Sequence, residues 1–321
     1  MNTGIVDTIG SPLVRLPAPD GSAIAAKLES FNPGGSAKDR PALAMIESAE
    51  AAGALDDGDR VVEATSGNTG IGLSMVCAAR GYDLTVVMPE SKSAERRQLM
   101  AAYGTDIELV DGDMADARDR ADTLAEETDG VRLHQFEDPA NPRAHYETTG
   151  PEILDALDGY TVDAFVAAVG TGGTITGVGR RLREAFPTVD IVAVEPASNA
   201  VLSGDAPGED EFQGMGPGFV SPNLDQTLLT EVETVTLETA AAECRRLART
   251  EGILVGQSSG AASVAATRVA ERIADPSVDC PPLPGDRTFS TDGGAAADCP
   301  LVVTIFPDSG ERYLSTGLFT D

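Results

Sequence analysis

The sequence predicts an α/β protein in which mostly parallel sheets are flanked by helices. From residue 60 onward, short β-branched runs alternate with longer segments of helical periodicity, a pattern typical of βαβ units. The chain has 321 residues, 41% of them hydrophobic, and can therefore bury one large or two modest cores. Because the alternation is interrupted around 135–150, we expect two α/β domains, 1–144 and 145–321. An arrangement in which residues 1–35 pack on the second domain stays open.

The elements follow in chain order. A Pro-Gly-Gly turn precedes an amphipathic stretch at 41–51, which predicts the first helix. Further helices are predicted at 70–79, 93–102 and 114–127, and directly after Gly173 and Gly256. The predicted strands are Arg60–Ala64, Asp83–Met88, Asp106–Val110, Ala164–Val169, Asp190–Val194, Ile253–Val255 and Leu301–Phe306. The stretch 275–299 is rich in Pro, Asp, Gly and Ser and predicts a surface loop.

Charge is the outlying feature of the composition. Asp and Glu number 52 against 23 Lys and Arg, which gives a net charge of −29. Nucleic acids and anionic membranes would repel such a surface, so we expect neither as a partner. Lysine occurs only as Lys27, Lys38 and Lys92. An acidic, lysine-poor surface favours a salt-adapted (halophilic) host, with an acidic protein from an ordinary host as the alternative.

The four cysteines show no C-x-x-C spacing, which disfavours a structural zinc site or a disulfide scaffold. His134 and His145 have no cysteine or carboxylate companions at ligand spacing, so no metal is expected. The first residues lack a basic segment followed by an apolar run, and no apolar stretch of about 18 residues occurs. We therefore expect a cytoplasmic protein.

The segment 32–40 delivers Lys38 just before the first predicted helix. A lysine amine that is desolvated, or that lies near other cations, can lose its proton and form a Schiff base with a carbonyl. The structural alternative is a surface lysine at a helix start, where the helix dipole disfavours positive charge. Because lysine is so scarce here, its presence at this turn favours function.

The segment 65–70, Thr-Ser-Gly-Asn-Thr-Gly, follows one predicted strand and precedes a helix. Ligands of open α/β sheets bind at the carboxyl ends of parallel strands. Hydroxyls, an amide and free backbone N–H groups at a helix start would suit a carboxylate. The alternative is a simple helix-capping turn, which needs only one of these side chains.

Two later turns also join a strand to a helix. Residues 170–174, Gly-Thr-Gly-Gly-Thr, can close backbone N–H groups around a phosphate. They match neither the Walker loop nor the dinucleotide fingerprint, because Ile175 stands where the latter needs a glycine. Residues 256–262, Gly-Gln-Ser-Ser-Gly-Ala-Ala, read by themselves as a capped helix packed closely on a sheet.

In this order and spacing, the four segments resemble the fold-type II pyridoxal 5′-phosphate (PLP) enzymes, and most closely the cysteine synthases. The resemblance extends over nearly the whole chain, through 11–16, 139–142, 148–152, 213–219 and 309–316. It implies two α/β domains, each with a twisted, mostly parallel sheet, and an active site in the cleft between them. It also implies a homodimer.

The resemblance assigns a role to each candidate residue. Lys38 would hold PLP as an internal aldimine and act as the catalytic base. Asn68 would bond the ring hydroxyl, Ser258 would face the pyridine nitrogen, and the cofactor phosphate would be bound by Gly170, Thr171, Gly172, Gly173 and Thr174. The substrate carboxylate would be bound by Thr65, Ser66, Thr69 and Gln135, with Asn68 beside them.

The implied reaction replaces the acetoxy group of O-acetyl-L-serine by sulfide, through an α-aminoacrylate, to give L-cysteine and acetate. Uncharged Ser258 cannot keep the pyridine nitrogen protonated as an aspartate would, which favours elimination over long-lived carbanion chemistry. Cystathionine β-synthase activity on serine and homocysteine is one alternative, and dehydratase action is a more distant one. A non-catalytic PLP-fold binding module is the alternative of a different class. The resemblance also offers the C-terminal tail of serine acetyltransferase as a partner.

Overall fold

The computed structural model describes residues 2–157, 159–209, 211–280 and 299–320. Within them the chain divides into two compact units. The first contains residues up to Ile9 together with Asn32–Ala144, and the second contains Gly10–Phe31 and residues from His145 onward. Each unit has its own sheet and its own core, so each is described separately.

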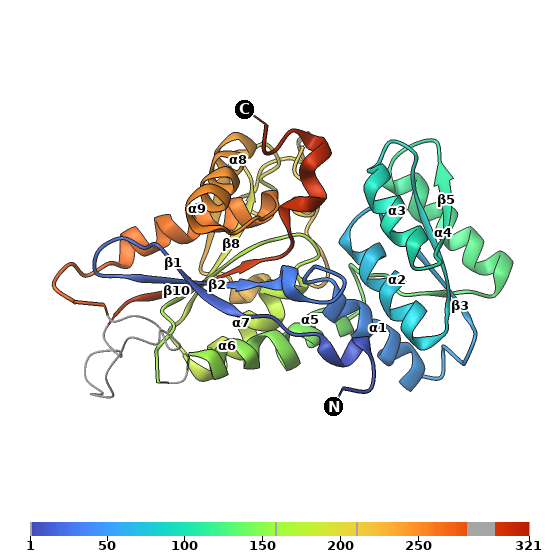
Figure 1. The fold of residues 1–321 in the computed structure, drawn as a ribbon, viewed down its shortest axis with the longest axis horizontal. Helices are drawn as coiled ribbons and strands as arrows, with labels where there is room; N and C mark the ends of the chain where they lie inside the picture. Colours follow the sequence, from blue (N-terminus) through green and yellow to red (C-terminus); the bar gives the residue numbers. More distant parts are fainter. Residues whose placement is uncertain (1, 158, 210, 281–298, 321) are drawn as a thin grey trace. The chain divides into compact units, whose positions relative to one another are not determined.

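The first unit is built on a four-stranded parallel sheet in the order β5-β4-β3-β6 (Figure 1). Its strands are β3 (Arg60–Ala64), β4 (Asp83–Pro89), β5 (Asp106–Val110) and β6 (Val131–Arg132). Its helical segments are η1 (Ile5–Thr8), α1 (Asp39–Ala51), α2 (Asn68–Arg80), α3 (Ala94–Ala102), α4 (Met114–Thr128) and α5 (Ala140–Ala144).

Side chains of this sheet alternate between two cores, as a strand period of two requires. Val61 and Val86 pack with the helices α1, α2 and α3, whereas Val62 and Val87 pack with α4 on the other face. The sheet is therefore covered on both sides, and its central strands β3 and β4 are almost wholly buried. This burial leaves the strand ends as the places where polar side chains can be exposed to a ligand.

The second unit is built on a six-stranded sheet in the order β1-β2-β10-β7-β8-β9. Only β1 is antiparallel to its neighbour β2 among these described strands; the other pairs are parallel. The strands are β1 (Leu13–Leu16), β2 (Ala23–Leu28), β7 (Ala164–Ala168), β8 (Asp190–Pro196), β9 (Glu231–Val235) and β10 (Leu301–Phe306).

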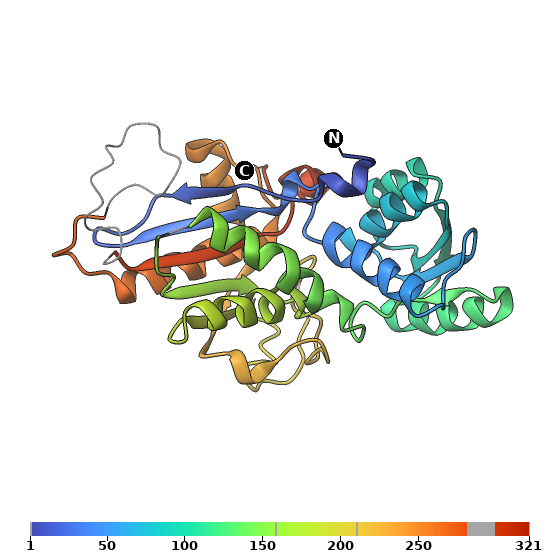
Figure 2. The same ribbon diagram turned by 90° about the horizontal axis from the view of Figure 1, so that it is seen from below.

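Helices cover both faces of this second sheet (Figure 2). Val302 and Phe306 of β10 pack with α8 and α9, and Val303 and Ile305 pack with α6 and α7. The helical segments are η2 (Glu29–Phe31), the π-helix η3 (His145–Thr149), α6 (Gly150–Ala156), α7 (Gly173–Ala185), η4 (Gln226–Leu228), α8 (Leu237–Arg246), the π-helix η5 (Leu247–Glu251), α9 (Gln257–Ile273) and η7 (Gly310–Thr316).

The predicted strand at 253–255 is wrong. In the structure only Val255 pairs, through an isolated antiparallel bridge with Ser309. The apolar run is too short to extend a ladder, and Ile253 instead packs against the core that contains side chains of α8 and α9. The other predicted strands and helices are present, with ends that differ by a few residues.

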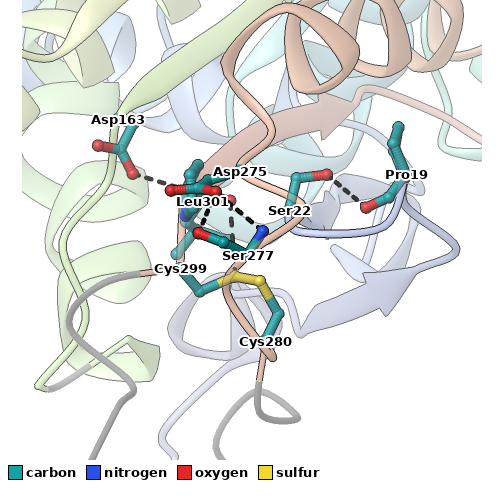
Figure 3. The surroundings of a disulfide bond; sticks show 9 residues. Pro19, Ser22, Asp163, Asp275, Ser277, Cys280, Cys299 and Leu301 are labelled. Carbon is teal, nitrogen blue, oxygen red and sulfur yellow. Dashed lines mark hydrogen bonds between the residues drawn. A yellow bond between two sulfur atoms is a disulfide. The ribbon is translucent and has the colours of Figure 1, made fainter.

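One disulfide, between Cys280 and Cys299, corrects the expectation that the cysteines form no such link (Figure 3). Sequence spacing missed it because the two partners are 19 residues apart and belong to no short motif. It lies at the amino end of β10, where the Leu301 N–H donates to the Asp163 carboxylate at 2.8 Å. Residues 281–298, most of the predicted surface loop, lie outside the described residues.

Among the residues that the structure describes, no helix is long and apolar enough to cross a membrane.

Candidate active site

Lys38 lies in the turn that opens α1, immediately before the first helical residue. The turn is fixed by local bonds: the Gly35 N–H donates to the Asn32 carbonyl at 2.8 Å, and the Gly34 N–H donates to the Asp39 carboxylate at 2.6 Å. A side chain at position 34 would place its Cβ 2.5 Å from that carboxylate, so glycine is required. The amine-bearing residue is thus held at the helix end where a positive charge is least favourable.

Residues 65–70 lie at the carboxyl end of β3, as the sequence predicts. Thr65 extends the sheet by one bond, since its N–H donates to the Val87 carbonyl at 3.1 Å. Asn68 and Thr69 form the first turn of α2, and both threonines are buried. The helix α2, which follows this loop, lies next to the start of α1, because a Cβ at Gly72 would lie 3.0 Å from the Lys38 carbonyl oxygen.

The structure brings Gln135 to this loop. The Thr69 hydroxyl donates to the Gln135 side-chain oxygen at 2.6 Å, although the two residues are 66 positions apart. Gln135 is 8% exposed, and its carbonyl accepts from the Asn141 side chain at 2.8 Å. Two members of the predicted carboxylate-binding set therefore meet in the first unit.

Residues 170–174 form a single turn between β7 and α7 in the second unit. Gly172 has φ +80° and is the residue before the helix. A Cβ at Gly170 would lie 2.5 Å from the Gly214 carbonyl oxygen, and one at Gly172 would lie 2.7 Å from Leu224. The Ser221 hydroxyl fixes the turn further by donating to the Thr171 carbonyl at 2.6 Å. At Gly170 and Gly172 the backbone therefore lies so close to its neighbours that a side chain at either position would collide with them.

This turn fits a phosphate. Its N–H groups open a helix of 13 residues, whose positive dipole end favours an anion. The glycines keep the backbone uncovered, and Thr171 and Thr174 add hydroxyl groups. A phosphate-bearing cofactor such as PLP matches this set of donors.

His145 is a neighbour of this turn that sequence reasoning did not connect with it. The side chain is fully buried, with its Nε2 3.2 Å from the Thr174 hydroxyl and its Nδ1 2.9 Å from the Thr149 hydroxyl. The π-helix η3 places His145 and Thr149 on one face. The sequence pointed to this neighbourhood only through the segment 148–152, which contains Thr149, one of the two partners of His145.

Ser258 lies in the first turn of α9 and is buried. The start of that helix is supported by the segment after β10. Here the Tyr313 hydroxyl donates to the Asp308 carboxylate at 2.8 Å, and a Cβ at Gly256 would lie 2.2 Å from the other oxygen of that carboxylate. Ser258 is thus an uncharged donor or acceptor on a rigid support, as a partner for a pyridine nitrogen should be.

The described part of the chain contains no group of three or more His, Cys, Asp or Glu residues that could hold a metal ion.

Comparison with known proteins gives a consistent result. Residues 7–279 match the family described as "Pyridoxal-phosphate dependent enzyme". The chain is 46% identical over 316 residues to a protein named cysteine synthase from Staphylococcus aureus, covering 97% of this chain and 94% of the relative. It is 43% identical over 320 residues to O-ureido-L-serine synthase of Streptomyces lavendulae, covering 98% and 92%.

A solved structure extends the similarity to the fold. The crystal structure of a cysteine synthase from Entamoeba histolytica superimposes with a TM-score of 0.89 at 35% identity, covering all of this chain and 91% of the other. The predicted fold class is therefore confirmed.

Proposed function

Because the chain belongs to the pyridoxal-phosphate dependent enzyme family, we propose that it is a cysteine synthase. The reaction converts O-acetyl-L-serine and sulfide to L-cysteine and acetate. The Cβ–O bond breaks, acetate leaves with the electron pair, and a Cβ–S bond forms to sulfide. The observation that carries the proposal is the 46% identity to a cysteine synthase over 97% of this chain.

PLP, when bound, withdraws electrons from the substrate Cα and so permits loss of its proton. Lys38 would hold the cofactor, and its amine would take the Cα proton as general base. The turn at 170–174 binds the cofactor phosphate. Asn68 would bond the ring hydroxyl, and Ser258 would face the pyridine nitrogen.

Thr65, Ser66, Thr69 and Gln135 bind and orient the substrate carboxylate. The bond between Thr69 and Gln135 supports this role, because it holds a hydroxyl and an amide side by side at a strand end. Because the Thr69 hydroxyl donates to the Gln135 oxygen, this bond orients the Gln135 NH2 group, which can donate to a carboxylate together with the hydroxyls of Thr65 and Ser66. Their task is to hold Cα in one orientation, which lowers the entropic part of the barrier.

The test is product formation with purified protein, added PLP and three substrate pairs. O-acetylserine with sulfide should give cysteine and acetate in equal amounts. Serine with homocysteine should be slower by about a hundredfold or more in kcat/KM. Hydroxyurea in place of sulfide tests the product class named for the Streptomyces relative. Faster turnover with either alternative pair would replace the proposal, and no turnover with any pair would favour a binding module.

We also propose that the protein works in a salt-rich cytoplasm. Support comes from the net charge of −29 and from arginine-based surface ion pairs such as Arg272 with Glu231 and Glu233. Salt screens repulsion among the excess acidic groups, so the free energy of unfolding should rise with KCl concentration. Urea unfolding in a KCl series checks this, and a fall in stability with added salt would contradict it.

Two assemblies complete the proposal: a homodimer and a complex with the C-terminal tail of serine acetyltransferase. Light scattering should give twice the mass of 33.1 kDa in concentrated KCl, and a monomer mass would contradict the dimer. A synthetic tail peptide should inhibit competitively with O-acetylserine. Inhibition that O-acetylserine does not relieve would place the peptide elsewhere.

A further inference from the structure

Glu63 is a buried carboxylate in the first unit, on β3 and two residues before Thr65. It is 2% exposed. Arg132 of the neighbouring strand β6 donates to its Oε2 at 3.0 Å and also to the Val62 carbonyl at 3.2 Å. An ion pair at this depth does not by itself stabilise a fold, because both charges lose their hydration.

The same carboxylate bonds the backbone that carries Gln135. Its Oε2 accepts from the N–H of His134, the residue before Gln135, at 3.2 Å. His134 has φ +52°, a left-handed conformation that a residue with a side chain rarely adopts. The bond from this N–H to Glu63 ties the left-handed turn to β3.

Gln135 is therefore held on three sides. Glu63 bonds the N–H of the preceding residue, His134, at 3.2 Å, Asn141 donates to the Gln135 carbonyl at 2.8 Å, and the hydroxyl of Thr69 donates to its side chain at 2.6 Å. Of these three, the bond from Glu63 fixes the left-handed turn that directs the side chain toward Thr69. Burial raises the pKa of Glu63, and the guanidinium of Arg132 and the His134 N–H lower it in part.

We propose that Glu63 is a positioning residue for substrate binding, which acts by holding the backbone of His134 and Gln135 so that the Gln135 side chain meets the substrate carboxylate. This inference rests on the proposed function, since it assumes that Gln135 binds that carboxylate. Glu63 touches neither substrate nor cofactor in this scheme. Its effect is on affinity for ligands that carry an α-carboxylate.

The test compares two ligands that have no leaving group on Cβ: L-methionine and L-methioninamide. They differ only in the carboxylate, and binding of either to the PLP-loaded protein is followed by its visible absorption. The main variant is Glu63→Gln, which keeps the size of the side chain but removes its charge and turns an NH2 group toward the N–H donors. The matched control is Asp122→Asn, because Asp122 pairs with the Nε of Arg132 at 2.7 Å on the exposed side and does not contact Gln135.

In Glu63→Gln we expect the Kd for methionine to rise about tenfold, while the Kd for methioninamide changes by less than about twofold. The KM for O-acetylserine should rise by a similar factor with kcat nearly unchanged, since the lost interaction is made equally before and during the reaction. Asp122→Asn should leave both ligands within about twofold of wild type. Glu63→Asp, which keeps the charge opposite Arg132, should show the same selective loss and serves if Glu63→Gln does not fold.

Equal weakening of both ligands would mean that Glu63 only supports the fold, and would overturn the inference. So would an unchanged ratio of the two Kd values in Glu63→Asp. The variant Gln135→Ala distinguishes failure of the positioning role of Glu63 from failure of the substrate-binding role of Gln135. If it weakens methionine binding while the Glu63 variants do not, the positioning role fails and the proposed substrate site stands; if it has no effect either, the assignment of Gln135 itself is wrong.

Discussion

In the first unit the candidate residues contribute side chains, whereas in the second the candidate turn contributes backbone. Thr69 and Gln135 are joined through their side chains at the end of β3. At 170–174 the essential feature is the lack of a side chain at Gly170 and at Gly172, since a Cβ at either position would collide with neighbouring atoms. The difference matches the two ligands: a substrate that varies among relatives needs selective side chains, and a constant phosphate needs only N–H donors. The comparison predicts that substitutions in the Thr69–Gln135 pair and in the turn at 170–174 affect different binding constants.

The largest effect is expected at Lys38, which both ligands require. Lys38→Ala should lower the rate of cysteine formation at least about a thousandfold, because it removes the cofactor attachment and the general base together. Lys92→Ala is the control, since Lys92 is an exposed lysine of the same unit. Cysteine formation at the wild-type rate by Lys38→Ala would refute both roles.

The second unit should control cofactor affinity. In Gly170→Ala the new Cβ would lie 2.5 Å from the Gly214 carbonyl oxygen, so the turn must move. We expect the Kd for PLP to rise about a hundredfold, from the loss of charge-assisted bonds to the phosphate. Gly179→Ala of α7 is the control, because its Cβ would make only ordinary contact with Ile191 at 3.4 Å. Equilibrium dialysis measures both, and an unchanged Kd in Gly170→Ala would break the comparison.

The Thr69–Gln135 pair of the first unit should control substrate affinity without loss of cofactor. Thr69→Val removes the hydroxyl that bonds Gln135 and should raise the KM for O-acetylserine about tenfold, with PLP content unchanged. Thr69→Ser keeps the hydroxyl and should restore most of the affinity. Loss of PLP from Thr69→Val at concentrations that saturate the wild type would show that the two units do not divide the ligands in this way.

The smallest effect on activity is expected at the disulfide, which lies at the amino end of β10, whereas Asp308 follows its carboxyl end. The double variant Cys280→Ser, Cys299→Ser should lose about 3 kcal/mol of unfolding free energy, the value for a closed loop of this size, and keep its kcat. Thermal unfolding with and without reductant checks the stability. A change in kcat/KM of more than about twofold would contradict this prediction, because it would mean that the amino end of β10 affects the active site.

Thiol titration provides the control for that variant. Burial raises the pKa of Cys77 and of Cys244 to about 12, so neither thiol should react in the native protein. Denaturation should expose these two thiols, and denaturation with reductant should expose all four cysteines. Four reactive thiols after denaturation alone would mean that the disulfide had not formed. Disulfides are rare in a reducing cytoplasm. The same titration on protein from cells whose free thiols were alkylated first shows whether the disulfide exists in the cell, and so also tests the proposed location.

The strand ends and their polar turns could be predicted from the sequence because local pattern determines both. Alternating apolar runs marked β3 and β7, and the turns after them stood out by composition. Lysine scarcity was a less selective signal. Lys27 is another of the three lysines, yet it is buried on β2 and forms an ion pair with Glu152 at 2.6 Å, which is a structural role.

The sequence did not predict which residues distant in the chain contact the candidate site residues. The contact of His145 with Thr174 and the bond of the Glu63 carboxylate to the His134 N–H depend on which strands and helices become neighbours. Glu63 reads in sequence as one polar residue within an apolar strand, and its partner Arg132 is 69 positions away. The disulfide was missed for the same reason, since no spacing rule joins residues 280 and 299.

The central claim is that this chain carries out PLP-dependent β-replacement on O-acetylserine. The most direct measurement is the visible absorption of the purified protein in concentrated KCl, recorded alone, after adding O-acetylserine without sulfide, and again after adding sulfide. We predict a violet-absorbing band that moves to longer wavelength with O-acetylserine and returns when sulfide is added. A band that O-acetylserine leaves unmoved, or no band after incubation with PLP, would contradict the account.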